Sequence, residues 1–345
     1  MNQNQPSRYR AFLLFMLIAM TCVPGCNSGQ DTAGANGSAA DSGTNGKSLT
    51  IAVIPKCTGG EFWETVEQGA RAAASDLSID LKWEGTLTET EIAEQNQIIE
   101  NMINLDVDGM AIAPLNAKAT SKPIVGAVDA GIPVVVFDSA VNGTSHTSFV
   151  ATNNQQGGTL GAEKMIELLG GNQGDIVIMR FVQGTASTEA RVEGFAKTIK
   201  DAGFKVLADP YSEDGTVAGA KKTAANTLEG LVKDQTLAVD GIFTCNLISA
   251  LGMAAALDDL RKSGVAVDAK VIGFDTSPKL IQGLQEGTID ALVAQDPKRM
   301  GYLAVETVVK HLRDEPIEEY IDTGVQVVTR DRLEDAEIRK LVGLE

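Results

Sequence analysis

The sequence lacks most of the side chains and motifs on which enzymatic sites depend. It has only two histidines, His146 and His311, in 345 residues, so a histidine base beside a nucleophile is close to excluded. The motifs H-E-x-x-H, paired C-x-x-C and G-x-S-x-G do not occur. The phosphate-holding patterns G-x-G-x-x-G after the first strand and G-x-x-x-x-G-K-[ST] are also missing. We therefore expect a protein that is not an enzyme, without a cofactor or bound metal.

Cysteine is scarce as well, and two of the four cysteines, Cys22 and Cys26, lie near the N-terminus. The others, Cys57 and Cys245, follow predicted strands in different halves of the chain. An exported protein could oxidise them to a disulfide. Such a bond would lock two halves that we expect to move, so we predict two buried free thiols.

The first 25 residues have the pattern of an export signal. Arg8 and Arg10 precede an apolar stretch over residues 11–20, which is too short to span a membrane comfortably. Val-Pro-Gly-Cys follows and ends at Cys26, which resembles the lipobox of bacterial lipoproteins. The resemblance implies lipidation of Cys26; the alternative is an ordinary signal peptide with an incidental cysteine. Either reading predicts an exported protein.

Residues 26–48 have almost no apolar bulk and are rich in Gly, Ser, Ala and Asn, which predicts a flexible tether. Loss of residues 1–25 would remove Arg8 and Arg10, changing the net charge from −17 to −19. A protein with this much negative charge repels nucleic acid and anionic lipid. We expect no nucleic-acid partner, and membrane attachment only through the N-terminal lipid.

From Leu49 onward, strand and helix patterns alternate along the chain. We predict strands over residues 49–54, 79–83, 109–113, 133–137, 148–151, 175–180, 204–208, 241–245, 270–274 and 290–295, and a last extended segment over residues 321–328. We predict helices over residues 61–75, 90–104, 118–130, 155–169, 187–202, 217–232, 246–263, 278–286 and 297–313. This order is typical of α/β proteins with parallel sheets, and its length and rhythm predict two doubly wound lobes.

Two predicted strands end in the same way. The apolar run Val134–Phe137 is followed by Asp138, and the run ending at Phe274 is followed by Asp275. Ligands of open α/β sheets bind beyond the carboxyl ends of the strands. We therefore predict that two lobes present carboxylate acceptors to one cleft.

Other polar and aromatic residues follow strand ends in the same manner. Phe62 and Trp63 could lie against a sugar ring, and the amides of Asn246 and Gln295 can both donate and accept hydrogen bonds. The guanidinium group of Arg191 could donate hydrogen bonds to two hydroxyl groups of a ligand. Each residue has a structural alternative: the aromatics as core, the Asp and Asn residues as helix N-caps, and Arg191 as a surface ion pair with Glu193.

Together these residues form a family pattern. The chain from Leu49 to about Arg330 resembles the ribose-type periplasmic substrate-binding proteins of ABC sugar importers. The resemblance implies two lobes joined by a three-strand hinge, with a sugar enclosed between them. The ligand-binding residues it implies are Phe62, Trp63, Asp138, Arg191, Asn246, Asp275 and Gln295.

The chain departs from ribose binders at Gly60, where they have Asn, and at Ser139, where they have Arg. A buried hydroxyl left without a partner costs ~1–3 kcal/mol, so ribose itself is in doubt. Lys56 could supply the missing cation, as in receptors for furanose signals; the alternative is a solvent-exposed loop charge. We add Lys56 and Ser139 to the predicted ligand-binding set. Tyr211 could stand in for the aromatic expected near Asp214.

These features predict the following organisation. A signal peptide spans 1–25 and a tether 26–48. The N-terminal lobe comprises 49–151 with 296–324, and the C-terminal lobe 152–295 with 325–335. Residues 336–345 form a C-terminal tail.

The implied function is capture of a ribose-like or related monosaccharide and its delivery to an ABC permease with its ATPase, by a monomer lipid-anchored in the periplasm. The alternative is a sugar or furanose-signal receptor that feeds a chemoreceptor or sensor kinase. A lactose-repressor-type regulator would need an N-terminal helix-turn-helix and a basic surface. This chain has the pattern of an export signal and, without residues 1–25, a net charge of −19 instead, which argues against such a regulator. A hydrolase would need a carboxylate pair that nothing singles out.

Overall fold

The computed structural model describes residues 48–171 and 173–344. Cys26, the predicted signal peptide and nearly all of the predicted tether lie outside the described residues. The strands are β1 Thr50–Ile54, β2 Asp80–Trp83, β3 Gly109–Ile112, β4 Val134–Phe137, β5 Ser148–Ala151, β6 Asp175–Met179, β7 Lys205–Ala208, β8 Val232–Lys233, β9 Thr236–Leu237, β10 Gly241–Thr244, β11 Lys270–Phe274, β12 Ala291–Gln295, β13 Tyr320–Asp322 and β14 Val325–Val328. The helices are α1 Glu61–Leu77, α2 Ile92–Asn104, α3 Ser121–Asp129, α4 Asn154–Leu168, α5 Ala186–Asp201, α6 Val217–Glu229, α7 Leu247–Lys262, α8 Pro278–Glu286, α9 Pro297–Leu312 and α10 Ala336–Leu341, with a 3-10 turn at Arg330–Glu334.

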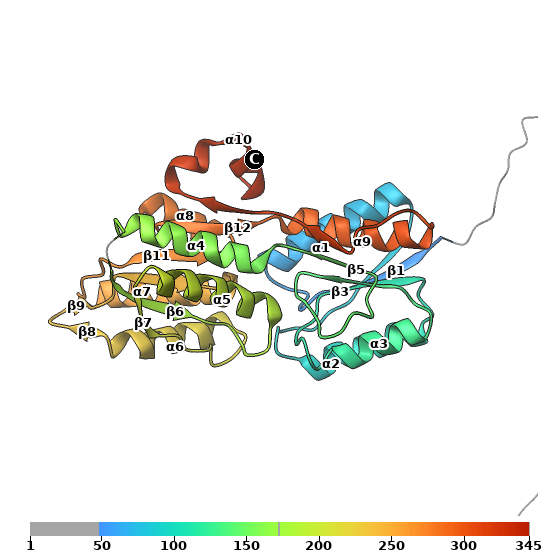
Figure 1. Ribbon diagram of the computed structural model, residues 1–345, viewed down its shortest axis with the longest axis horizontal. Helices are drawn as coiled ribbons and strands as arrows, with labels where there is room; N and C mark the ends of the chain where they lie inside the picture. The colour runs from blue at the N-terminus through green and yellow to red at the C-terminus, as the bar shows by residue number, and fades with distance from the viewer. Residues whose placement is uncertain (1–47, 172, 345) are drawn as a thin grey trace, which may run out of the picture. The chain divides into compact units, whose positions relative to one another are not determined.

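One sheet organises the N-lobe, which comprises β1–β5, β13, α1–α3 and α9. Its strand order is β13-β5-β4-β3-β1-β2, and every pairing is parallel. Helices α1 and α9 pack on one face and α2 and α3 on the other (Figure 1). Strands β3 and β4 are buried at every position, because helices cover both faces of the sheet.

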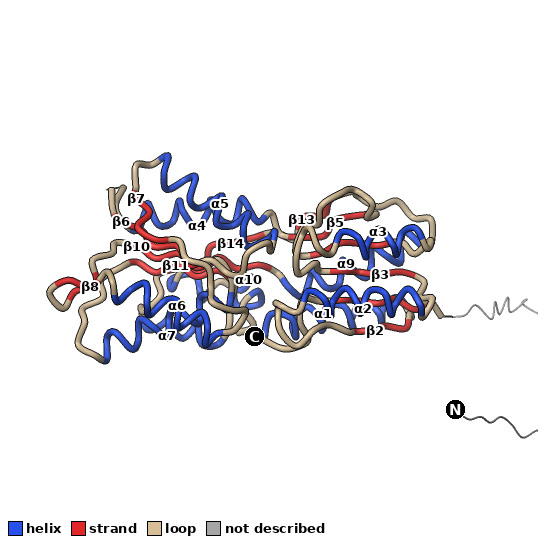
Figure 2. The backbone as a smooth tube through the Cα atoms, turned by 90° about the horizontal axis from the view of Figure 1, so that it is seen from below, coloured by secondary structure: helices blue, strands red, loops and turns tan. Residues whose placement is uncertain are grey.

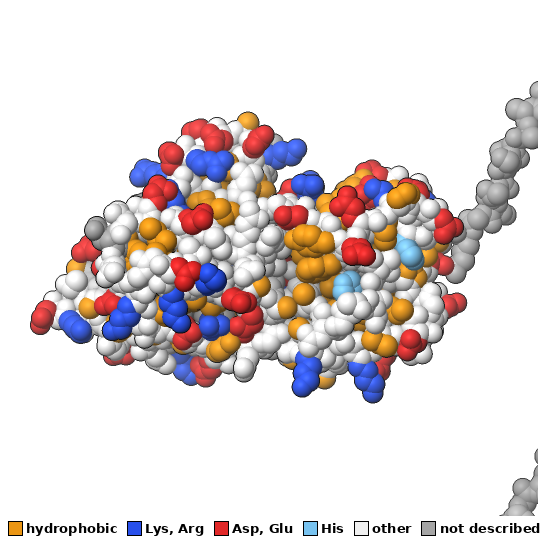
Figure 3. Space-filling model, viewed as in Figure 1, with side chains coloured by type: hydrophobic (Ala, Val, Ile, Leu, Met, Phe, Trp, Pro, Cys, Tyr) orange, Lys and Arg blue, Asp and Glu red, His pale blue; other side chains and the backbone are white. Residues whose placement is uncertain are grey.

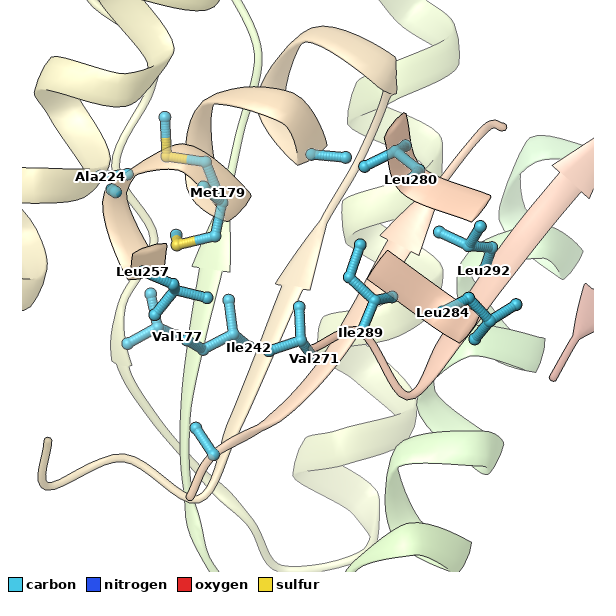
Figure 4. Packing of buried hydrophobic residues seen from close by; sticks show 14 of the residues in the cluster. Val177, Met179, Ala224, Ile242, Leu257, Val271, Leu280, Leu284, Ile289 and Leu292 are labelled. Atoms are coloured by element: carbon cyan, nitrogen blue, oxygen red, sulfur yellow. The ribbon is translucent and has the colours of Figure 1, made fainter. Parts of the chain in front are cut away.

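A second sheet organises the C-lobe, which comprises β6–β12, β14, α4–α8 and α10. Its order is β14-β12-β11-β10-β6-β7, with β14 antiparallel to β12 and the rest parallel. Figure 2 shows the strands of each sheet between helices. Val177, Ile242 and Val271 line up across neighbouring strands and meet Leu257 of α7 and Leu284 of α8 (Figure 4). The predicted α/β fold of two doubly wound lobes is therefore confirmed.

The chain passes between the lobes at three places: between β5 and α4, between β12 and α9, and between β13 and β14. The extended segment predicted over residues 321–328 is divided into β13 and β14. Thr323 and Gly324 interrupt it, and Gly324 has φ +85°, a left-handed conformation that interrupts a regular strand. The two halves of this segment therefore pair with different sheets.

Three further segments differ from the sequence prediction. The helix predicted over 217–232 ends at Glu229, and the following residues form the β8–β9 hairpin. The helix predicted from residue 118 begins later, because the Asn116 side chain accepts hydrogen bonds from the backbone N–H groups of Lys118 and Ala119. The predicted tail contains α10, whose Ile338 is fully buried in the C-lobe core.

Cys57 and Cys245 are both free and buried, which confirms the predicted thiols. Burial raises the pKa of Cys57 to about 12 and that of Cys245 to about 11.

The surface carries charges of both signs. On the face in Figure 3, acidic and basic side chains are interspersed. Within the described ranges, no helix is long and apolar enough to cross a membrane.

Candidate functional site

A cavity of about 80 Å³ lies where the carboxyl ends of strands from both lobes converge. Its lining residues are Lys56, Cys57, Gly59, Gly60, Phe62, Trp63, Glu89, Asp138, Ser187, Thr188, Arg191, Asn246, Leu247, Ile248, Asp275 and Gln295. Every predicted ligand-binding residue except Ser139 is in this set. The structure therefore brings residues spread over 240 positions, from Lys56 to Gln295, to one place.

The N-lobe contributes a buried ion pair. Lys56 Nζ lies 2.6 Å from Asp138 Oδ2, and the two side chains are 3% and 4% exposed. Lys56 follows β1 and Asp138 follows β4, so the parallel sheet places both at the same edge. The alternative of a solvent-exposed lysine is wrong.

The C-lobe contributes a second buried carboxylate. Asp275 accepts hydrogen bonds from Gln295 Nε2 at 2.6 Å and from the backbone N–H of Leu247 at 2.8 Å. Burial raises the pKa of Asp275, while Arg191 and Gln295 act in the opposite direction. Because Leu247 is the first residue of α7, the carboxylate also lies at the positive end of a helix.

Asp138 and Asp275 share an uncommon backbone conformation. Their φ angles are +60° and +71°, in the left-handed region that aspartate tolerates better than most residues. Each follows a phenylalanine that is fully buried in its sheet. Such backbone costs of order 1–3 kcal/mol and clusters at ligand sites; here it turns the chain where each strand meets the cavity.

Arg191 is held on several sides. Its guanidinium stacks 3.9 Å from the centre of the Phe274 ring. Its Nε donates to Asn154 Oδ1 at 2.8 Å and its Nη1 to the backbone carbonyl of Cys245 at 3.1 Å. Nη1 also lies 3.8 Å from Asp275 Oδ2. The alternative of a surface ion pair is wrong, because Arg191 is only 2% exposed.

Asn246 combines the two roles considered for it. It is the N-cap of α7, and its Oδ1 accepts from the backbone N–H of Ser249 at 3.0 Å. It also lines the cavity, and Nδ2 has no hydrogen-bond partner among the described residues. That donor is therefore free to meet a ligand.

The two aromatic residues form one wall of the cavity. Phe62 and Trp63 pack edge to face with ring centres 5.0 Å apart. Trp63 is buried in the N-lobe core, where it also packs against Phe137. The core alternative thus holds for Trp63, although it also lines the cavity.

Ser139 and Tyr211 do not line the cavity. Ser139 is fully buried and bonds to Ser187 of the C-lobe. Tyr211 lies against Arg180 and donates its hydroxyl to Glu189 at 2.9 Å. Asp214 accepts hydrogen bonds from the backbone and hydroxyl of Thr216.

The sequence analysis missed Glu89, Ser187 and Thr188. Glu89 Oε1 accepts a hydrogen bond from Trp63 Nε1 at 2.8 Å, and burial raises the pKa of Glu89. Its position in the loop after β2 could have indicated it, since that loop also follows a strand's carboxyl end. Ser187 and Thr188 lie in the first turn of α5, which begins at Ala186, and no sequence pattern singles them out.

The lobes touch one another around the cavity. Lys56 Nζ donates to Ser187 Oγ at 3.2 Å, the N–H of Ala117 to the carbonyl of Gly184 at 3.2 Å, and Thr185 Oγ1 to the carbonyl of Leu115 at 3.2 Å. These contacts close the lobes over the cavity, so a ligand can enter or leave only when they break.

Residues 51–316 match the family model of the periplasmic binding protein domain. The chain belongs to the periplasmic binding protein family. Members of this family are binding proteins of transport systems and not enzymes. Among the described residues, no group of three or more His, Cys, Asp or Glu side chains is placed to hold a metal ion.

Curated relatives and solved structures agree with this family. The D-allose-binding periplasmic protein of Escherichia coli is 27% identical over 265 residues, covering 75% of this chain and 83% of the relative. The ribose import binding protein RbsB of Escherichia coli is 26% identical, covering 81% and 90%. A carbohydrate transporter solute binding protein from Agrobacterium radiobacter, solved with D-arabinose, is 32% identical with a TM-score of 0.79, covering 86% and 99%. An ABC transporter solute binding protein from Agrobacterium vitis, solved with D-fucose, is 33% identical with a TM-score of 0.78, covering 85% and 99%.

Proposed function

We propose that this protein captures a monosaccharide, ribose-like or related, between its two lobes and delivers it to an ABC permease and its ATPase. The observation that carries the proposal is the shared cavity, where Asp138 from one lobe faces Arg191, Asn246 and Asp275 from the other. A ligand that contacts both lobes favours the closed state by the interactions it makes only there. Neutral sugars bound by similar proteins support the substrate class.

Binding calorimetry over a panel of pentoses, hexoses and furanose signals tests the proposal. We expect one sugar to bind, and Asp275→Asn to weaken it by about 10- to 150-fold, because hydrogen bonds to charged groups contribute about 1.5–3 kcal/mol. Asp258→Asn on the exposed side of α7 is the matched control and should bind as the wild type does. Binding by Asp275→Asn at wild-type affinity, in a folded protein, would contradict the proposed site.

We further propose that Cys26 is lipidated and that the mature chain is a monomer anchored in the periplasm. The two lobes, 49–151 with 296–324 and 152–295 with 325–335 extended by α10, would move about the three crossings. The export and lipobox patterns support the anchor. Partitioning of the protein into the detergent phase, lost in Cys26→Ala, would test it, and light scattering would test the monomer.

The alternative is a receptor that presents bound sugar to a chemoreceptor or sensor kinase. Stimulation of the ATPase of a reconstituted permease by the sugar-loaded protein would favour transport. Loss of chemotaxis with intact uptake after gene deletion would favour the receptor.

A further inference from the structure

The charges around the cavity do not balance. Its lining carries the carboxylates of Glu89, Asp138 and Asp275 but only the cations of Lys56 and Arg191. Asp138 is paired with Lys56 at 2.6 Å, and Asp275 lies 3.8 Å from Arg191. With all five groups ionised, the lining has a net charge of −1, and Glu89 is the carboxylate left over.

Glu89 is positioned to meet a ligand. Its Oε1 accepts a hydrogen bond from Trp63 Nε1. Its Oε2 has no hydrogen-bond partner among the described residues. Trp63 is buried and its ring fixes the carboxylate at the aromatic wall. Burial raises the pKa of Glu89, while Lys56 and the hydrogen bond from Trp63 act in the opposite direction. Oε2 is therefore an acceptor that the described residues leave without a hydrogen bond.

We propose that Glu89 is a ligand-contacting residue and that the cleft takes an amino-substituted sugar or polyol in preference to its neutral parent. This inference rests on the proposed function and specifies its substrate class. An ammonium group at Oε2 would balance the lining charge and form a charge-assisted hydrogen bond, about twice as strong as a neutral one. A neutral sugar would close the cleft over an uncompensated carboxylate, which is unfavourable.

Calorimetry with matched sugar pairs tests the inference on the full chain. The probes are galactose with galactosamine, glucose with glucosamine, and mannose with mannosamine, in a neutral buffer, because acid would protonate Glu89, whose pKa is raised by burial. In the best-binding pair we expect the amino sugar to bind about tenfold more tightly, which corresponds to about 1.4 kcal/mol. Glu89→Gln should remove this advantage, because a neutral amide cannot form an ion pair with the ammonium group.

The control is Glu84→Gln, the same substitution at an exposed residue directly after β2 and outside the cavity. It should keep the wild-type ratio, and circular dichroism should show that both variants are folded. Equal or weaker binding of the amino sugars by the wild type, or an unchanged ratio in Glu89→Gln, would overturn this inference and leave the proposed function standing. No binding by any sugar, amino or neutral, in this panel or the broader one would overturn both.

Discussion

Ser139 of the N-lobe caps a helix of the C-lobe. Its Oγ accepts a hydrogen bond from the backbone N–H of Ser187 at 3.0 Å, and Ser187 lies in the first turn of α5. The local cap residue, Thr185, makes no cap hydrogen bond and instead donates its hydroxyl to Leu115 of the N-lobe. The helix end is therefore completed by the opposite lobe, and only while the lobes are in contact.

We predict that Ser139→Ala favours the open state. Loss of a serine N-cap costs about 0.5–2 kcal/mol, so the ratio of closed to open molecules without ligand should fall by about 2- to 30-fold. Distances between spin labels on the two lobes would measure it. Ser148→Ala is the control, since Ser148 bonds to Glu318 within the N-lobe and should leave the lobe distances unchanged. The same distance distribution in Ser139→Ala and wild type would contradict the cap.

Gly158→Ala should destabilise the C-lobe and weaken ligand binding together. A Cβ at this position of α4 would collide with the backbone carbonyl of Arg191, so α5 must shift and move the guanidinium. Overpacking of this kind costs about 1–3 kcal/mol, measurable by urea unfolding. Gly126→Ala in α3 meets nothing within 4 Å and should be neutral or stabilising. Equal stability of the two variants would show that the α4–α5 contact can relax.

Glu89→Gln should stabilise the protein at neutral pH. Burial raises the pKa of Glu89 in the folded state, so the folded chain binds more protons than the unfolded one between the ordinary value near 4.3 and the raised value. Stability is therefore lost as the pH rises through this window. The melting temperature of the variant should exceed that of the wild type at neutral pH. This difference should vanish below about pH 4, whereas a constant difference at all pH values would contradict a titrating Glu89.

The thiols of Cys57 and Cys245 should be unreactive in the folded protein. Both are buried, with pKa values raised to about 12 and about 11, and the thiolate is the reactive form. In a chain with Cys22 and Cys26 changed to serine, a thiol reagent at mildly alkaline pH should label neither until denaturant is added. Rapid labelling of one thiol without denaturant would contradict this prediction and show that the region around that thiol opens in the folded protein.

The sequence alone determined the two-lobe α/β architecture and most of the polar set at the cleft. The runs that end in Phe137–Asp138 and Phe274–Asp275 identify buried parallel strands and their carboxyl ends locally. Because all carboxyl ends of a parallel sheet lie at one edge, residues after different strands could be assigned to one site from the sequence alone. Asn246 and Gln295 were placed by the same argument, whereas Lys56 was added because of the resemblance to receptors for furanose signals.

Only the tertiary structure decided how the lobes meet. Whether Ser139 contacts a ligand or caps α5 depends on where Ser187, 48 residues away in the chain, lies in the closed arrangement. Likewise, the excess of carboxylates over cations that Glu89 creates can be recognised only when the charges of both lobes are counted around one cavity. Local patterns of hydrophobicity specify strands and helices, whereas contacts between lobes depend on the hinge, whose geometry no short stretch of sequence encodes.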